Sequence, residues 1–388
     1  MNPRDRLIAA LTGGTADRVP LSLPEYRFVR TREDVDALKD PAKREIASRV
    51  FDRGAAFLRF DSHVNRNFCT PPQFIREARR EQIEGKVRVT YEIDTPKGKL
   101  TNIVEWSLEV ATRWTVKYPV ESLEDIEKIR SLRWELPAEL CTPDLSDLPT
   151  NFHERCLTRT GISSPVICAA GMMPYEYFLM LCATEPNLVR ELAIECKNRL
   201  LKILDVLLAD RNIDYLWMGG CEWLTPPMGR PEMYAEFIQP HEAELIARAH
   251  AAGSLVHVHC HGNMRSTLEM VIERGGDYVE PMEPPPDGDM TMAEAKDLAA
   301  GRITLGGSIE ARLIECESAD VVEQAVRAAF EGGKHRMILT TTAGPIDRMS
   351  PTAAENYHRL IDVWEELSPV EPCLSAPGRP ESARDERS

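Results

Sequence analysis

Short apolar runs alternate with longer amphipathic stretches along most of the chain, which is typical of an α/β protein. Apolar runs of strand length fall at residues 18–23, 55–61, 164–169, 213–218, 254–259, 277–280, 302–307 and 336–341. Helical periodicity fills most of the rest, at 4–12, 41–53, 173–211 in two parts, 232–252, 264–274, 291–300, 317–331 and 351–366. Eight strands joined by crossover helices predict a (β/α)8 TIM barrel. A doubly wound open sheet is less favoured, because no Gly-x-Gly-x-x-Gly follows the first strand.

One segment departs from this alternation. Residues 86–118 alternate with period two around the turn at 95–98, Thr-Pro-Lys-Gly. This pattern predicts an antiparallel β-ribbon inserted after strand two, as a lid or as a wall of the substrate site. We expect a single barrel domain at 1–368, followed by a disordered tail at 369–388 that is rich in Pro, Ser, Arg and Glu.

Composition excludes several classes of function. The 47 basic and 62 acidic side chains give a net charge of -15, which argues against nucleic acid or an anionic membrane as a partner. No stretch approaches the roughly 18 to 20 apolar residues that span a bilayer, and the first residues do not resemble a signal peptide. The ten cysteines form no C-x-x-C pair. We therefore expect a cytoplasmic protein with reduced thiols, which acts on a small molecule.

The fifth predicted strand ends in a run of histidines, His-Val-His-Cys-His-Gly-Asn at 257–263. Because side chains alternate along a strand, His257, His259 and His261 share one face, which we expect to point into the barrel. Two imidazoles at this spacing can bind one divalent ion of the zinc class, so His259 and His261 are the predicted metal ligands. His257 lies one layer deeper and is expected to support them. Interior histidines held by hydrogen bonds alone are the alternative.

Acidic residues follow the neighbouring strands and are expected at the same end of the barrel. A carboxylate or a thiolate from these loops would complete a three-ligand site with an open position. Our first choice is Glu222, and Cys221 and Glu283 come next. Each of these residues is equally consistent with a solvated loop position.

Two further segments contain candidate residues. Residues 340–347 form a turn rich in hydroxyl groups, which includes Thr342 and leads to Ser350, a good helix N-cap followed by proline. The turn could bind an anionic group, but a purely structural turn explains it as well. Asp61, at the end of strand two, is an inward-facing candidate for catalysis or a structural cap.

The order of these motifs resembles that of the uroporphyrinogen decarboxylase superfamily from about residue 3 to 366. The matching pieces are Pro-Arg-Asp-Arg at 3–6, Asp-Arg-Val-Pro at 17–20, Pro-Glu-Met-Tyr at 231–234, the histidine run, Pro-Met-Glu-Pro-Pro at 281–285 and Leu-Gly-Gly-Ser-Ile-Glu at 305–310. The superfamily includes tetrapyrrole decarboxylases and zinc-dependent methyltransferases that exchange methyl groups with corrinoid proteins.

The histidine run is more similar to the methyltransferase branch. The His-x-Cys-Gly-Asn motif of that branch corresponds to His259-x-His261-Gly262-Asn263, so His261 stands where the branch has a cysteine ligand. Its last cysteine ligand would fall near 342–344, where this chain has none. These two departures from the branch favour an imidazole-rich site with one carboxylate over a thiolate-rich one. Asn263 and Thr342 are the predicted cofactor-binding residues. Asp61 resembles the active-site aspartate of the decarboxylases.

The leading hypothesis is therefore a metal-dependent methyltransferase or O-demethylase. It would use a divalent metal, zinc by preference, with His259, His261 and Glu222 as ligands and Asp61, Glu222 and Glu283 as catalytic residues. A corrinoid carried by a partner protein, or another one-carbon carrier, would exchange the methyl group, and a homodimer is left open. A decarboxylase of a polycarboxylic substrate and a non-enzymatic corrinoid- or metal-binding protein are the alternatives.

Overall fold

The computed structural model describes residues 1–371 except 108–111, 147, 149–150, 345 and 347–348. Most of the tail expected at 369–388 thus lies outside the described residues. Within the described part, no helix is both long enough and apolar enough to cross a membrane. The nine described cysteines all carry free thiols, as we expected.

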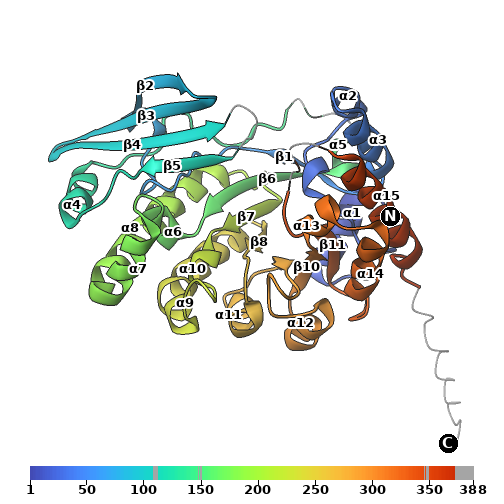
Figure 1. Cartoon of the computed structure of the whole chain (residues 1–388). Helices are drawn as coiled ribbons and strands as arrows, with labels where there is room; N and C mark the ends of the chain where they lie inside the picture. Colours follow the sequence, from blue (N-terminus) through green and yellow to red (C-terminus); the bar gives the residue numbers. More distant parts are fainter. Residues whose placement is uncertain (108–111, 147, 149–150, 345, 347–348, 372–388) are drawn as a thin grey trace, which may run out of the picture.

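A parallel sheet of seven strands forms the centre of the molecule and curls toward a barrel (Figure 1). The strands pair with their neighbours in chain order. They are β1 (Ala56–Arg59), β6 (Cys156–Ser163), β7 (Tyr215–Gly219), β8 (Leu255–His259), β9 (Tyr278–Met282), β10 (Thr304–Ile309) and β11 (Met337–Thr341). The predicted α/β architecture with a curled parallel sheet is confirmed, but the described residues contain seven regular strands where we expected eight, so the closed (β/α)8 barrel stays a prediction.

The expected first strand at 18–23 is reduced to a single parallel bridge between Leu21 and Leu339. Pro20 and Pro24 interrupt this segment and have no N–H to donate to a ladder, which explains why no regular strand forms. The segment nevertheless lies beside β11, since Leu339 N donates to Pro20 O at 2.9 Å. Further along, Phe57 N of β1 donates to Arg27 O at 2.7 Å. Residues 20–27 therefore contact both edge strands of the sheet.

The third strand was predicted in the wrong place. We expected a strand at 164–169, but this segment forms the buried helix α6 (Pro165–Ala170), and the strand is the preceding β6. Proline at the first helical position favours the helix. The strand sequence, Cys-Leu-Thr-Arg-Thr-Gly-Ile-Ser, carries an arginine and two threonines, so it lacks the apolar run that we used to recognise strands.

Helices cover the outside of the sheet (Figure 1). Some of them begin with a side-chain cap that the sequence contains, as at α15, where Ser350 Oγ accepts from Ala353 N at 3.0 Å. The covering helices are α3 (Pro41–Val50), α7 (Tyr175–Thr184), α8 (Pro186–Leu207), α9 (Pro231–Phe237), α10 (Gln239–Ala251), α11 (Leu268–Glu273), α12 (Met292–Ala299), α13 (Ala311–Cys316), α14 (Ala319–Ala329) and α15 (Pro351–Leu367). Shorter helices are α2 (Arg32–Asp36) and α5 (Phe152–Arg155), together with the 3-10 turns η1 (Pro24–Tyr26), η2 (Pro72–Phe74), η3 (Cys221–Leu224) and η4 (Met264–Ser266).

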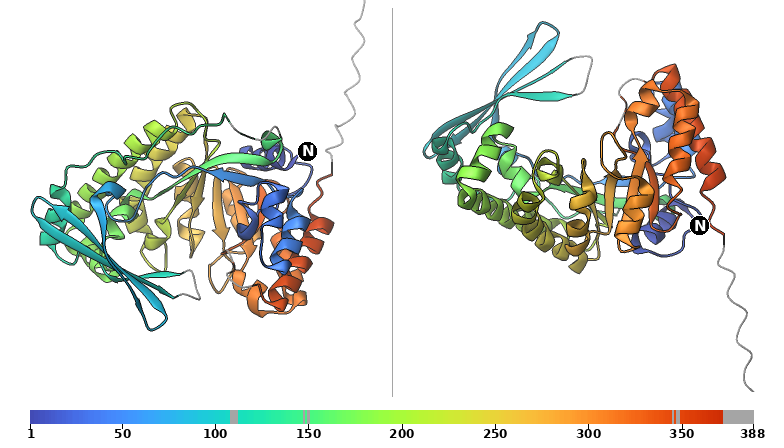
Figure 2. Two further views of the ribbon diagram at one scale, coloured as in Figure 1. Left: turned by 90° about the horizontal axis from the view of Figure 1, so that it is seen from above. Right: turned by 60° about the horizontal axis from the view of Figure 1, so that its bottom comes forward.

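The predicted ribbon is part of a larger antiparallel sheet, which projects from the body in both views of Figure 2. Its strands are β2 (Ile75–Ile83), β3 (Lys86–Thr95), β4 (Gly98–Ser107) and β5 (Arg113–Lys117). It lies between β1 and β6 in the chain, where we expected it, but it begins at Ile75 rather than at 86. Ile93 and Leu100 from the sheet share a buried cluster with Ile126 and Ile129 of α4 (Leu123–Ser131), which anchors its inner face.

The interior of the curled sheet is apolar at its amino end. Leu7 and Leu11 of α1 (Pro3–Thr12) form a buried cluster with Phe57, Leu157 and Tyr215 from three strands. Helix α1 therefore closes this end of the sheet. The histidine run lies at the opposite, carboxyl end of the sheet, where β8 ends at His259.

Candidate metal centre

Parallel pairing holds the histidines of β8 in a fixed layer. His257 is opposite Trp217 on β7 and Tyr278 on β9, and His259 is opposite Gly219 and Glu280. A Cβ at position 219 would lie 2.4 Å from the Trp217 ring, so glycine there leaves room for the indole beside His259. The centroids of the Trp217 and His259 rings are 5.3 Å apart. An aromatic wall therefore borders His259.

The side chains of His259 and His261 meet through their Nε2 atoms, which are 3.2 Å apart. Gly262 permits this turn, because its φ of +94° lies in the left-handed region. Two imidazole nitrogens bound to one tetrahedral zinc ion at about 2.0–2.1 Å would lie roughly 3.3 Å apart. The pair therefore fits one divalent ion of the zinc class.

Glu283, which follows β9, fixes the orientation of His261. Its Oε1 lies 2.9 Å from His261 Nδ1, and its Oε2 accepts from Gly262 N at 2.9 Å. A carboxylate at Nδ1 favours the tautomer whose Nε2 lone pair is free for a metal ion. This contact gives Glu283 the position of a supporting residue rather than of a ligand.

A second set of ligands overlaps with the first. The donor atoms of His257, His259 and Glu280 all lie within 4.8 Å of one another, so these residues could also hold a metal ion. Glu280 is fixed by Arg27, whose Nη2 lies 2.6 Å from Glu280 Oε1, and His257 Nε2 lies 3.2 Å from Glu280 Oε2. His259 belongs to both sets and is the central residue of the cluster.

Burial sets the proton affinity of the two central imidazoles. It lowers the pKa of His259 to about 4, with Glu280 opposing and His261 adding to the effect. Burial also acts against protonation of His261, but the hydrogen bond and charge of Glu283 outweigh it and raise the pKa of this residue. Near neutral pH, His259 is therefore an uncharged imidazole, which is the form that binds metals.

These shifts predict how the metal-free protein titrates. In an NMR titration, His259 should protonate only near pH 4, and His261 should protonate above the ordinary histidine pKa of about 6.5. Between pH 6.5 and 4, His259 is protonated in the unfolded chain but not in the folded protein. The unfolded state therefore binds more protons, and the contribution of His259 to stability falls as the pH falls. The His261 contribution is complete below about pH 6.5 and is lost as the pH rises through its raised pKa. Titration of His259 near 6.5 would contradict this description.

The other predicted site residues lie at various distances from the pair. Glu222 Oε2 is buried without a hydrogen-bond partner in the described residues, and burial raises the pKa of Glu222 against the charges of His261 and Arg66. It makes no described contact with either histidine. The buried Cys221 Sγ lies 3.7 Å from the backbone oxygen of His259 and 3.8 Å from Arg274 Nη2. The thiol thus contacts Arg274, a residue of the helical layer.

The three remaining candidates lie in the loops around the carboxyl end. Asp61 is exposed, and its Oδ1 accepts from His63 N at 2.9 Å, as in a structural cap. Asn263 N donates to Pro226 O at 2.8 Å. Thr342 is buried and its Oγ1 accepts from Ala311 N at 3.3 Å. Two residues of its turn, Pro345 and Asp347, lie outside the described residues.

Arg27 and Glu280 are site residues that we did not predict. Arg27 follows the expected first strand and Glu280 ends the expected sixth strand, but their contact joins residues 253 positions apart. Arg27 Nη2 also donates to Thr340 Oγ1 at 3.0 Å. Only the curled sheet brings these segments together, and a clue was the presence of an arginine and a glutamate in segments expected inside the barrel.

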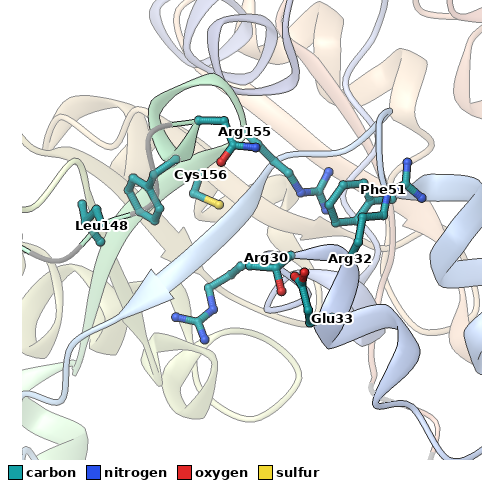
Figure 3. A pocket seen from close by; sticks show the side chains of 10 residues that line it. Arg30, Arg32, Glu33, Phe51, Leu148, Arg155 and Cys156 are labelled. Atoms are coloured by element: carbon teal, nitrogen blue, oxygen red, sulfur yellow. The ribbon is translucent and has the colours of Figure 1, made fainter.

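A separate cavity of about 490 Å3 lies at the amino ends of β1 and β6 (Figure 3). Phe51 lies between two guanidinium groups, with Arg155 Cζ 3.8 Å and Arg32 Cζ 4.1 Å from its ring centroid. Arg30 also lines this cavity. None of the described histidines lines this cavity. It lies at the end of the sheet opposite to the histidine pair.

The chain is similar in sequence to one protein family and in structure to two solved proteins. The sequence profile of the uroporphyrinogen decarboxylase (URO-D) family matches residues 113–367. The solved structure of a methyltransferase from Methanosarcina mazei is similar over 94% of this chain and 99% of that chain, with a TM-score of 0.58 and 15% identity. A B12-independent methionine synthase from Shewanella sp. W3-18-1, in complex with selenomethionine, is matched over 76% of this chain and 75% of that one, with a TM-score of 0.38 and 12% identity. No curated protein sequence matches the chain.

Proposed function

The chain belongs to the uroporphyrinogen decarboxylase family, and on that premise we propose that it is a metal-dependent methyltransferase or O-demethylase. A methyl group would pass between a small substrate and a corrinoid, or another one-carbon carrier, held by a partner protein. The shared fold of the Methanosarcina mazei methyltransferase is compatible with this activity. Fold alone does not determine function, so the proposal rests on the site.

The observation that carries the proposal is the 3.2 Å separation of His259 Nε2 and His261 Nε2. In this proposal both imidazoles hold the ion, and a carboxylate completes the set. One candidate is Glu280, whose carboxylate lies within ligand distance of His257 and His259. The other is Glu222, our first expectation, whose buried Oε2 has no hydrogen-bond partner in the described residues. A zinc-class ion would supply a Lewis acid that activates a thiol or polarises the oxygen of a methyl ether.

The protein's own residues have supporting tasks. Glu283 holds the Nδ1 proton of His261 and keeps Nε2 directed at His259. The Arg27–Glu280 pair fixes the layer below, with side chains only 13% and 3% exposed. Trp217 shields one side of His259 from water. Asp61 and Thr342 remain candidates for contact with the substrate or the carrier, as does Asn263 on the loop that follows His261.

Metal removal and reconstitution test the proposal. The full chain would be freed of metal with a chelator, reloaded with zinc, and assayed for methyl transfer from methoxylated compounds to reduced cobalamin. We expect formation of methylcobalamin only after reloading, with release of the demethylated alcohol or phenol. His335, an exposed residue that contacts Gly13 far from the site, provides a matched control as His335→Ala. Equal rates before and after reloading would rule out a metal-dependent transfer.

Decarboxylation is the second candidate, because the matching family is described by that activity. Asp61 resembles the aspartate of the decarboxylase active site and lies exposed after the carboxyl end of β1. This function would give carbon dioxide release that persists with chelator present and is lost in Asp61→Asn. The same reconstitution experiment therefore separates the two functions.

A further inference from the structure

Two arginines lie side by side on neighbouring strands of the curled sheet. Arg59 on β1 is the direct register partner of Arg159 on β6. Each follows by two residues a member of the interior cluster, Phe57 and Leu157 respectively. Because side chains alternate along a strand, both arginines belong to the inward-facing set.

Neither arginine has an acidic partner within the described part of the chain. Arg27, the other inward arginine of this layer, forms an ion pair with Glu280, whereas no carboxylate lies within ion-pair distance of Arg59 or Arg159. Burial lowers the pKa of Arg159 to about 10; the charges of Arg27 and Arg59 add to this effect, while Tyr215 and the charge of Glu280 oppose it. Adjacent, partly desolvated cations are unfavourable unless an anion compensates them.

Aromatic rings surround the Arg159 guanidinium. Its Cζ lies 5.5 Å from the ring centroid of Phe28 and 5.6 Å from those of Phe57 and Trp217. Phe28 is 44% exposed and Arg59 is also exposed, whereas Arg159 is half-buried, so the pair opens to solvent on the Arg59 side. Trp217 contacts both Arg159 and His259, which places Arg159 one side chain away from the histidine pair.

We infer that Arg59 and Arg159 bind the carboxylate of a small aromatic substrate, whose opposite end reaches His259 and His261. Guanidinium groups match the planar carboxylate through paired hydrogen bonds, and the rings of Phe28 and Trp217 suit an aromatic body. The inference rests on the proposed function for the role of the histidine end. It adds the class of substrate, an aromatic carboxylate that carries a methyl ether.

Binding to the full-length protein tests this site without requiring turnover. The probes are 4-methoxybenzoate and its neutral counterpart 4-methoxybenzamide, titrated by calorimetry. We expect the carboxylate to bind at least about tenfold more tightly than the amide, since charge-assisted hydrogen bonds are the stronger class. Arg159→Gln and Arg59→Gln should each weaken binding of the carboxylate by about tenfold or more and leave the amide unchanged. Arg59 is exposed, so its variant decides the test if Arg159→Gln does not fold.

The matched control is Arg30→Gln, because Arg30 lines the separate cavity of Figure 3. This variant should bind 4-methoxybenzoate as the unmodified chain does. Equal affinity for acid and amide would overturn the inference, and so would loss of binding in Arg30→Gln with retention in Arg59→Gln. Arginine-dependent binding without methyl transfer would keep the anion site and reject the proposed function. Methyl transfer from neutral ethers that is insensitive to both arginine substitutions would keep the proposed function and reject the anion site.

Discussion

Replacing His259 by alanine is expected to abolish stoichiometric metal binding, with a loss of affinity of at least about 100-fold. The reason is that His259 is the residue shared by both candidate ligand sets, the pair with His261 and the group with His257 and Glu280. No alternative set of three ligands is described that omits it. Changes to supporting residues around metal sites already reduce affinity by about 10–100-fold, so loss of a ligand should exceed that range.

The measurement is a zinc titration of the metal-free chain in competition with a chromogenic chelator, followed by elemental analysis of the dialysed protein. Glu283→Gln should give an intermediate loss of about 10–100-fold, because it removes the charge that orients His261 but leaves both imidazoles in place. His335→Ala should bind metal as the unmodified chain does. Absence of bound metal in the unmodified chain, or equal affinity in His259→Ala, would contradict the metal centre.

A second comparison identifies which ligand set is used. His261→Ala should be as damaging as His259→Ala if the Nε2 pair holds the ion, whereas His257→Phe should be the more damaging substitution if the deeper set does. His257 is 2% exposed and packs 4.4 Å from the Tyr278 ring, so phenylalanine preserves much of its packing. The two outcomes are mutually exclusive for a single tightly bound ion.

The sequence is sufficient to predict those strands and helices whose own residues carry the pattern, either an apolar run or a helix cap. Strands β7 to β11 coincide with apolar runs, and the Ser350–Pro351 cap starts a helix where we expected one. The third strand was not recognised because β6 places Arg159 as well as Leu157 in the interior, so its sequence lacks a continuous apolar run. The first strand failed for a local reason, since Pro20 and Pro24 cannot complete a ladder.

At the site, too, contacts within one strand or between neighbouring loops could be predicted, whereas contacts across the sheet could not. Alternation along β8 was enough to group His259 with His261, and the loop after the next strand supplies Glu283 as expected for parallel strands. The Arg27–Glu280 pair and the placement of Trp217 over Gly219 depend on contacts across the curled sheet. Such contacts depend on strand register and packing, which a single sequence does not specify.

A large loss of stability is expected on replacing Arg274 by methionine. Arg274 Nη2 lies 2.7 Å from Glu242 Oε2, and both side chains are 0% exposed. Removing one member of a buried ion pair leaves the other charge uncompensated, which typically lowers the free energy of unfolding by roughly 3–5 kcal/mol. Arg302→Gln is the matched control, because its ion pair with Glu269 is 45% exposed on both sides. Such surface pairs contribute about 0–1 kcal/mol.

The pH dependence of this defect identifies its cause. Burial raises the pKa of Glu242, and the charge of Arg274 is the main influence that opposes the rise. Without Arg274 the pKa of Glu242 should rise further, so the folded variant takes up a proton more readily than its unfolded chain does. Its stability then falls with increasing pH. Denaturant unfolding should therefore give a larger difference from the unmodified chain at pH 8 than at pH 5.

The double variant Glu242→Leu/Arg274→Met separates charge from packing. Replacing both members of a buried pair by apolar residues of similar volume is often neutral or stabilising, so much of the lost stability should return. An equally unstable double variant would instead assign the defect to packing around Cys221, whose Sγ lies 3.8 Å from Arg274 Nη2. Because Cys221 Sγ is also 3.7 Å from the backbone oxygen of His259, a loss of metal affinity in Arg274→Met that the double variant does not restore would link this ion pair to the position of β8.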